Sequence, residues 1–199
     1  MTRPLLIAIV AVGSCAAQQI KVVANAPFSA TQLTQTLQTL ADGNKVTRTT
    51  TVSIMRDSEG RTRREQGNAV FIVDPVAGTA YVLDSKAKTV RKYSIQAAAA
   101  TAPEVRQTTG TIDGLAVETS NLHRAIAVGE AGNDAALEIS SEVNWSPELQ
   151  EPILTRTLDP RTGETTTQLK DIKRAEPDHR QFEVPLDFVL AEAAGKEIK

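Results

Sequence analysis

The side chains that most often carry out catalysis are scarce in this chain. It holds two histidines, His123 and His179, and one cysteine, Cys15. It has no nucleophile-elbow, zinc-protease, phosphate-loop or calcium-loop motif. We therefore predict no catalytic residue, no metal ligand and no cofactor. The catalytic alternative is a hydrolase that uses two of the 24 Asp and Glu side chains, and this function would require a cleft that holds both.

A second group of residues could bind a ligand. Leu137, Ile139, Val143 and Trp145 alternate with polar residues, a pattern that predicts a strand with one apolar face and one wet face. Such a strand belongs to an antiparallel sheet that is covered on one side. Trp145 has two interpretations: it lines an apolar ligand groove, or it is a core residue at the end of the sheet. The four apolar residues are the candidate ligand-binding set.

The charges are distributed unevenly, although the net charge is only -2. Lysine and arginine outnumber the acids in residues 21–100, and the acids prevail in residues 101–199. Two solvated faces of different charge are the favoured interpretation. The alternative is a basic patch that contacts an anionic surface, with Arg61, Arg63 and Arg64 as its contacts and Arg48 and Arg56 nearby. The small net charge argues against nucleic-acid binding.

The first residues have the layout of a secretory signal. Arg3 precedes an apolar run over residues 5–12 that ends in small residues. This run is too short to cross a bilayer, which needs about 20 apolar residues. Two processing routes fit: cleavage near Ala17, which we favour, or lipidation of Cys15, which would tether the protein to the outer membrane. We expect a periplasmic or extracellular protein, with the tethered lipoprotein as the alternative.

Turn signals divide the remaining chain into short strands. Asp begins each signal, and Gly follows at the position where a hairpin needs a positive φ; the signals lie at Asp42-Gly43, Asp57 to Gly60, Asp74 to Gly78, Asp113-Gly114 and Asp159 to Gly163. The segments between them are rich in Val, Ile and Thr, which favours antiparallel hairpins. Residues 31–39 fit a strand better than a helix because of their threonines. Residues 94–105 are the better helix candidate, although their composition equally suits a flexible connector.

The domain plan is simple. We expect a signal over residues 1–17, one β-rich domain over residues 18–190 and a polar tail over residues 191–199. Cys15 is the only cysteine and lies in the signal, so the domain has no disulfide and must be stabilised by its core.

The order of these hairpins resembles that of exported bacterial domains in the outer-membrane lipoprotein carrier (LolA-like) group. The resemblance covers most of the domain, and it is carried by Ile72-Val73-Asp74-Pro75, Tyr81-Val82-Leu83-Asp84, Trp145-Ser146-Pro147-Glu148-Leu149, Asp159-Pro160 with Thr165-Thr166-Thr167, and Glu176-Pro177-Asp178 with Phe182-Glu183-Val184-Pro185. It implies a mainly β (α+β) fold: a curved antiparallel sheet, an unclosed half-barrel, with one or two short helices. In the carriers the concave apolar face receives acyl chains.

Two non-catalytic functions follow from these observations. The favoured hypothesis is an envelope protein that binds an apolar ligand, a lipid or a lipidated protein on the concave face. The alternative is a structural or regulatory envelope module that contacts a membrane or a protein through the basic strand.

Overall fold

The computed structural model describes residues 18–99 and 108–191. These residues form thirteen strands and one 3₁₀ helix. The strands are β1 (Gln18–Val22), β2 (Phe28–Thr39), β3 (Lys45–Arg56), β4 (Thr62–Gln66), β5 (Ala69–Asp74), β6 (Thr79–Asp84), β7 (Thr89–Ala99), β8 (Thr108–Ile112), β9 (Leu115–Ile126), β10 (Leu137–Ser146), β11 (Glu151–Asp159), β12 (Gly163–Lys173) and β13 (Val189–Leu190), and the helix is η1 (His179–Phe182).

All of these strands belong to one sheet. Its order is β1-β7-β6-β5-β4-β3-β2-β12-β11-β10-β9-β8, and β13 pairs with β7 off this path. The strands from β2 to β7 form one meander and those from β8 to β12 form a second, because each strand pairs with the next in sequence. The antiparallel ladder between β2 and β12 joins the two meanders. Within the described residues, only β1 and β13 pair in parallel, both with β7.

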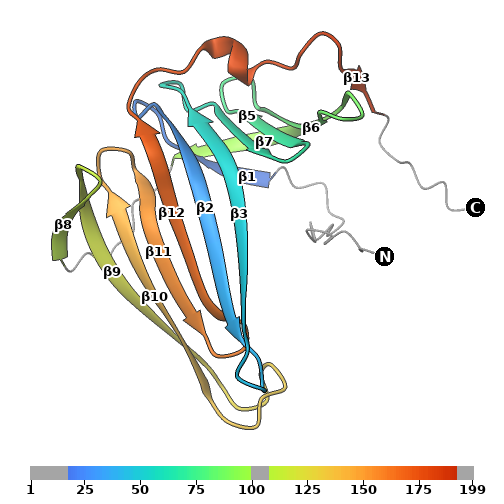
Figure 1. The fold of residues 1–199 in the computed structure, drawn as a ribbon. Helices are drawn as coiled ribbons and strands as arrows, with labels where there is room; N and C mark the ends of the chain where they lie inside the picture. Colours follow the sequence, from blue (N-terminus) through green and yellow to red (C-terminus); the bar gives the residue numbers. More distant parts are fainter. Residues whose placement is uncertain (1–17, 100–107, 192–199) are drawn as a thin grey trace, which may run out of the picture.

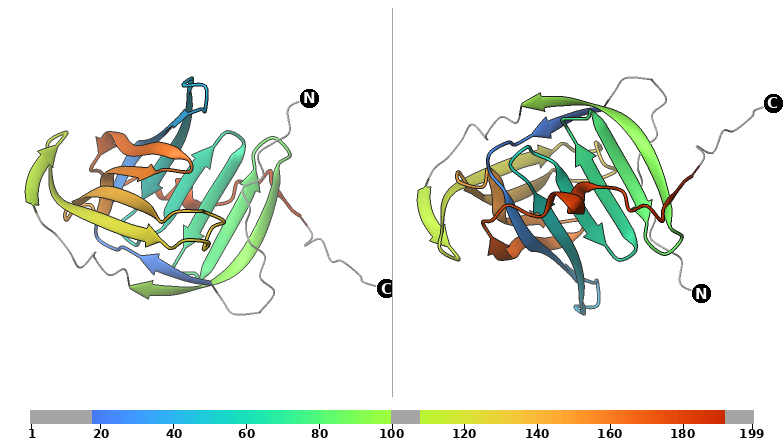
Figure 2. Two further views of the ribbon diagram at one scale, coloured as in Figure 1. Left: turned by 90° about the horizontal axis from the view of Figure 1, so that it is seen from below. Right: turned by 90° about the horizontal axis from the view of Figure 1, so that it is seen from above.

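The sheet is strongly curved and does not close. Figure 1 shows the long strands β9 to β12, β2 and β3 as one wall, with β5 to β7 turned across its upper end. Seen from below and from above, the strands surround an interior, and the edge strands β1 and β8 remain unpaired with each other (Figure 2). The predicted fold, a curved antiparallel sheet in an unclosed half-barrel, is confirmed. The described residues contain one short helix, η1.

Aspartate side chains hold the turns at which the meanders reverse. The Asp74 carboxylate accepts hydrogen bonds from the Val76 and Ala77 amides at 3.0 and 2.9 Å. Asp113 and Gly114 both adopt a positive φ, 47° and 77°, which is the backbone of a type I′ hairpin. The turn at Asp84, which the sequence analysis did not predict, has the same Asp-to-amide bonds as the turn at Asp74. The turn chemistry therefore explains why neighbouring strands in sequence are neighbours in space.

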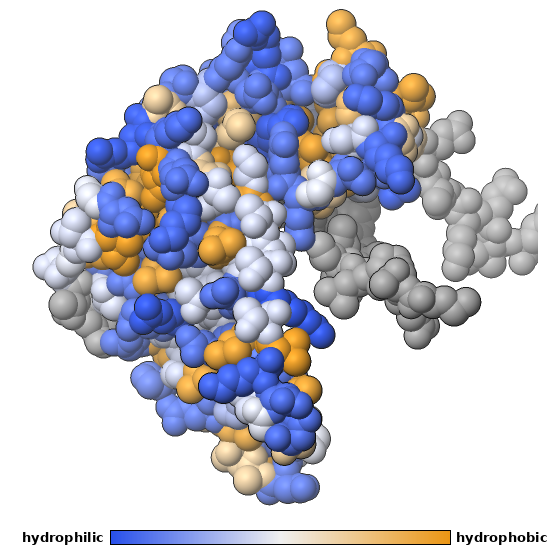
Figure 3. Space-filling model, in the orientation of Figure 1, coloured by the Kyte–Doolittle hydropathy of each residue, from blue (hydrophilic) through white to orange (hydrophobic). Residues whose placement is uncertain are grey.

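Two apolar clusters lie on opposite faces of the sheet. The inner cluster lies on the concave side between the two meanders and contains Phe28, Ala30, Ile54, Leu115, Val117, Leu149, Ile153 and Leu169. The outer cluster lies under the C-terminal segment and contains Val70, Ile72, Leu83, Val90 and Phe182. Figure 2 shows this segment, with η1, crossing the outside of β4 to β7. The outer face of the long wall is mostly pale or blue in Figure 3, as expected for strands rich in threonine.

The helix expected over residues 94–105 is wrong for the part that the structure describes. Residues 94–99 continue β7, and residues 100–105 lie outside the described residues. The cause is tertiary pairing: the second half of β7 pairs in parallel with β1, with Gln18 opposite Ile95 and Val22 opposite Ala99. These hydrogen bonds outweigh the local helix preference of alanine.

The expected one-sided burial of β10 is also wrong. Its fully buried residues are Asn144 and Ser146, whereas Leu137, Ile139, Val143 and Trp145 are all half-buried. The pairing of β10 with β11 is irregular between Asn144 and Trp145. Such a bulge changes which side chains face each side of a strand, and simple alternation does not anticipate it.

A buried arginine connects three parts of the inner face. Arg56 ends β3, and its side chain is 4% exposed. Its Nε donates to the Ala26 carbonyl at 3.0 Å, its Nη2 donates to the Leu149 carbonyl, and its Nη1 lies 3.3 Å from the Glu151 carboxylate. Its guanidinium also lies over the Phe28 ring, 4.8 Å from the ring centre. The end of β3, the segment before β2 and the turn between β10 and β11 are thereby held together.

Arg56→Ala should therefore destabilise the protein strongly. The change leaves the Glu151 carboxylate and two buried carbonyl groups without their donor, and we expect a loss of about 3–5 kcal/mol in the free energy of unfolding. Arg48→Ala, at an exposed position of the same strand, should change it by less than about 0.5 kcal/mol. Urea unfolding of both variants measures the difference, and equal losses would show that the buried contacts of Arg56 are unimportant.

Gly163 should tolerate no side chain. It has a φ of +93° at the start of β12, and an added Cβ would overlap the Leu37 carbonyl oxygen of β2. Gly43 has a similar φ, +84°, with open space around it. We expect Gly43→Ala to cost about 1 kcal/mol and Gly163→Ala more than about 3 kcal/mol, as measured by thermal or urea unfolding. Similar losses in the two variants would contradict a close contact between β12 and β2.

Candidate ligand-binding site

The inner face of β4 to β7 carries an apolar surface. The register sets Phe71 opposite Val82, Val73 opposite Ala80 and Ala69 opposite Asp84, so these side chains share one side of the sheet. We call Ala69, Phe71, Val73, Ala80 and Val82 the inner floor. The same register sets Ile54 of the inner cluster opposite Arg64, and Arg64 opposite Phe71. The inner floor therefore faces the concave side.

The inner floor is only partly covered. All five of its residues are half-buried, and neither apolar cluster includes any of them. The buried side chains of β5 and β6, such as Ile72 and Leu83, point instead to the outer face and pack under Phe182. The C-terminal segment thus covers the outer face of β4 to β7, while the inner cluster is built mainly from the long wall.

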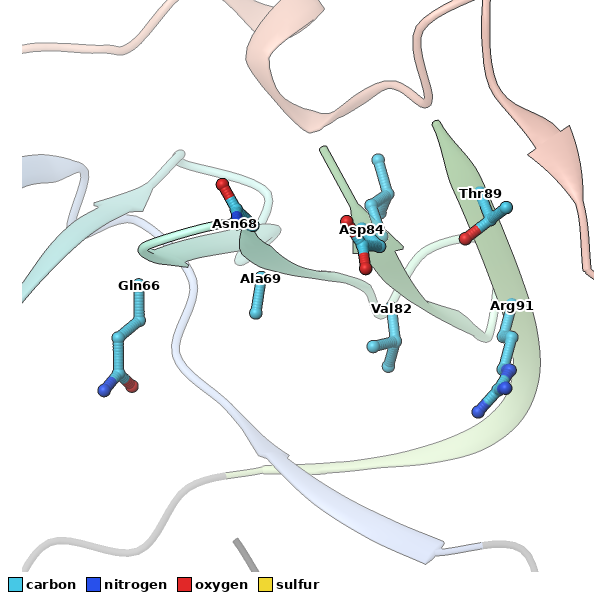
Figure 4. A pocket seen from close by; sticks show the side chains of 8 residues that line it. Gln66, Asn68, Ala69, Val82, Asp84, Thr89 and Arg91 are labelled. Atoms are coloured by element: carbon cyan, nitrogen blue, oxygen red, sulfur yellow. The ribbon is translucent and has the colours of Figure 1, made fainter. Parts of the chain in front are cut away.

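Two hollows border the inner floor. The larger has a volume of about 480 Å³ and is lined by Gln66, Asn68, Ala69, Val82, Leu83, Asp84, Thr89 and Arg91. In Figure 4 the side chains of Gln66, Ala69, Val82 and Arg91 all point away from the C-terminal segment, toward the side on which β1 lies. The smaller hollow, about 200 Å³, lies at the end of β1 and is lined by Val22, Val23, Arg56, Gly60, Thr62, Arg64, Val73 and Glu151. The two hollows lie at opposite ends of one apolar surface.

Charged groups stand at the borders of both hollows. Burial raises the pKa of the Glu151 carboxyl and lowers the pKa of the Arg56 guanidinium, and the attraction between the two groups opposes both shifts. The Arg64 Nη2 donates to the Gln32 side-chain carbonyl at 2.5 Å. Asp84 accepts the Lys86 and Ala87 amides, both at 2.9 Å. The site thus combines an apolar surface with fixed polar groups, an arrangement that is typical of small-molecule binding.

The four residues expected to bind a ligand on β10 lie elsewhere on the concave side. Val143 is opposite Thr155, Thr155 is opposite Thr167, and Thr167 is opposite Thr34 of β2. Through this register Val143 shares a face with Ala30 and with the inner floor, as do Leu137 and Ile139 by alternation. They stand on the other wall of the half-barrel, and neither hollow includes them or Trp145.

The three arginines expected to form an anionic-surface contact are separated by the structure. Arg61 lies in the turn before β4, where its Nε donates to the buried Asp57 carboxylate at 2.6 Å and its Nη2 pairs with Glu59. Arg63 pairs with Glu65 and donates to the Gln181 carbonyl at 2.9 Å, on the outer face. Arg61 and Arg63 are therefore each paired with nearby carboxylates. Arg64, by contrast, faces the concave side.

Other candidate residues take no part in this site. Cys15, the expected lipid anchor, lies outside the described residues, together with the whole expected signal. His123 is exposed, with its Nδ1 2.8 Å from the Glu138 carboxylate, and His179 is exposed in η1. No three metal-ligating side chains gather anywhere in residues 18–99 and 108–191. Nor does that part of the chain contain a helix with the length and apolar character needed to cross a membrane.

The sequence analysis missed the inner floor, although the signal for it was present. The turn at Asp74 places Val73 opposite Ala80 and therefore Phe71 opposite Val82. The hairpin between β4 and β5 then adds Arg64, and the unpredicted turn at Asp84 adds Arg91. The strand register alone predicts that these residues lie in one row across the sheet. Which of the two apolar faces of β5 and β6 is covered depends on the path of the C-terminal segment, which the register does not predict.

Comparisons with known proteins bear on the fold alone. No family model matches this chain, and no curated protein matches it. An uncharacterised conserved protein from Thermus thermophilus is similar in structure, with a TM-score of 0.50, 8% identity, and coverage of 83% of this chain and 90% of that one. This likeness shows a shared fold.

Two further structures are more distant. MucB in the MucA/MucB complex of Pseudomonas aeruginosa matches with a TM-score of 0.42 and 12% identity, and the match covers 85% of this chain and 59% of that one. A LolA superfamily protein from Nitrosomonas europaea matches with a TM-score of 0.27 and 11% identity, over 79% and 90% of the two chains. These scores are too low to support any conclusion about function. The part of the LolA-like expectation that the structure bears out is the unclosed half-barrel itself.

The free energy of unfolding of the protein should depend on pH through Glu151, which lines the smaller hollow. Because burial raises the pKa of this carboxyl above its ordinary value of 4.5, the folded protein holds a proton there at a pH at which the unfolded chain has lost it. The contribution of Glu151 to the free energy of unfolding is thus greatest below pH 4.5 and falls as the pH rises through the folded pKa.

This dependence can be measured by urea unfolding between pH 4 and 7. The wild type should lose stability relative to Glu151→Gln as the pH rises. Glu148→Gln, at a side chain that is 52% exposed, should follow the wild type at every pH. A difference between wild type and Glu151→Gln that does not change with pH would contradict the raised pKa.

Proposed function

We propose that this protein is an exported, non-catalytic binding protein that takes an apolar ligand, a lipid or the lipid chain of a partner protein, on its inner floor. One observation carries the proposal: five apolar side chains on the concave side are only half-buried, and two of them, Ala69 and Val82, line a hollow of about 480 Å³. A volume of this size is typical of pockets that bind small molecules. Covering the inner floor would remove apolar surface from water, which is the usual driving force for such binding.

The polar groups around the hollows fit binding better than catalysis. The lining residues include neither histidine nor serine. Their two carboxylates are engaged, Asp84 by turn amides and Glu151 by Arg56. A general acid or base must instead be free to exchange a proton with a bound substrate.

The proposed location follows from the first residues of the chain. The expected signal over residues 1–17 directs the protein to the cell envelope, and Cys15 offers a lipid anchor if it is retained. Lipids and lipidated proteins are abundant in that compartment, so the proposed ligand class and the proposed location agree.

Binding can be tested with Nile red, an uncharged dye that fluoresces in apolar surroundings. The wild type should bind the dye, and Val82→Asp should weaken binding at least about tenfold, because a carboxylate on the inner floor would have to lose its hydration. Val76→Asp introduces the same change at a turn position that is 68% exposed, and it should bind like the wild type.

A second variant distinguishes a loss of dye binding from a loss of folding. Ala69→Leu adds apolar volume to the larger hollow without adding charge, and it should also weaken dye binding while circular dichroism and the unfolding midpoint remain near those of the wild type. Lipid extraction from protein purified from its native envelope, followed by mass spectrometry, identifies the natural ligand. Absence of dye binding by the wild type, or equal binding by all three variants, would refute the proposed function.

A further inference from the structure

The two hollows together have an excess of positive charge. The lining residues of the two hollows include three arginines, Arg56, Arg64 and Arg91, and two carboxylates, Asp84 and Glu151. Arg56 is buried and Glu151 is half-buried, whereas Arg64, Arg91 and Asp84 are exposed, so a head group beside them would meet a net positive charge whose attraction is screened by salt. The kind of head group that a ligand carries therefore matters to its binding.

The two carboxylates and one of the arginines are already engaged. Glu151 pairs with Arg56, which also donates to two backbone carbonyls. Asp84 is held by the amides of its own turn. These bonds leave Arg64 and Arg91 as the cations that can meet a ligand.

Arg91 is the freer of the two. Arg64 donates to Gln32, and it lies close enough to Glu151 to lower the pKa of that carboxyl. Arg91 has neither a hydrogen bond from its side chain nor an ion pair with any residue in 18–99 or 108–191. It lines the larger hollow, and in Figure 4 its guanidinium points to the same side as Val82.

The register places this cation at one end of an apolar row. Arg91 is directly opposite Val82, Val82 is opposite Phe71, and Phe71 is opposite Arg64. Because strands lie about 4.8 Å apart, the Phe71 position lies about 10 Å from that of Arg91. An alkyl chain of about eight to ten carbons, at roughly 1.25 Å per carbon, spans this distance when it lies across the strands.

We infer that the ligand is an anionic amphiphile, a single alkyl chain with a carboxylate or phosphate head group, whose head is bound by Arg91 and whose chain crosses Val82 and Phe71. This inference rests on the proposed function and adds the charge of the head group and its position. Arg91 supplies the charge-assisted hydrogen bonds, and Thr89, which lines the same hollow, adds a hydroxyl donor. The uncharged analogue of such a ligand keeps the apolar contacts and loses the ionic ones.

Displacement of Nile red at low salt tests the head group. Decanoate and decyl phosphate should displace the dye at about tenfold lower concentration than decanol does. Arg91→Gln should remove that advantage and leave displacement by decanol unchanged. Arg156→Gln, at an exposed position of β11, is the matched control and should behave like the wild type. Inorganic phosphate should displace no dye, which distinguishes an amphiphile from a free anion.

The outcomes separate this inference from the proposed function. Equal displacement by decanol and decanoate, or an advantage of decanoate that survives Arg91→Gln, would overturn the inference while the binding function stands. Displacement by inorganic phosphate as effective as that by decyl phosphate would also overturn it, because the site would then recognise an anion alone. If Nile red, decanol and decanoate all fail to bind the wild type in calorimetry, the proposed function and the inference fail together.

Discussion

The buried guanidinium of Arg56 is the interaction on which the inner side of this sheet depends. A charge in an apolar interior is costly unless it is paired and hydrogen-bonded, and Arg56 meets this condition with two backbone carbonyls, one carboxylate and an aromatic ring. Its partners come from the segment before β2 and from the turn between β10 and β11. The same arginine therefore positions both meanders and forms one wall of the smaller hollow.

The partly exposed inner floor follows from how the two faces of β4 to β7 are used. Both faces of β5 and β6 are apolar, and the C-terminal segment packs on the outer face through Phe182. The inner face of these strands lies on the concave side, and the inner cluster packs mainly against the long wall. A half-barrel whose β5 and β6 present a partly exposed apolar surface to the concave side is the result.

Local chemistry made much of the fold predictable. Asp-to-amide bonds and positive-φ glycines act within a few residues, so the hairpins at Asp74 and Asp159 could be located from the sequence. Non-local pairing could not be located in this way: the second half of β7 is a strand because β1 lies beside it, and the bulge opposite Asn144 arises between two strands. The candidate site was missed for a related reason. Arg64 and Arg91 are far apart in sequence and share a row only through three hairpins.

The ladder between β2 and β12 has a kinetic consequence. Every other antiparallel pair joins strands that are adjacent in sequence, so each meander can form through short loops. The β2–β12 ladder instead pairs Leu37 with Glu164 and Ser29 with Lys173, and it must wait for the rest of the chain to be ordered or held nearby. An unfolded chain would thus assemble the two half-sheets first and join them last. Until they join, the long edges of β2 and β12 are open to pairing with other chains.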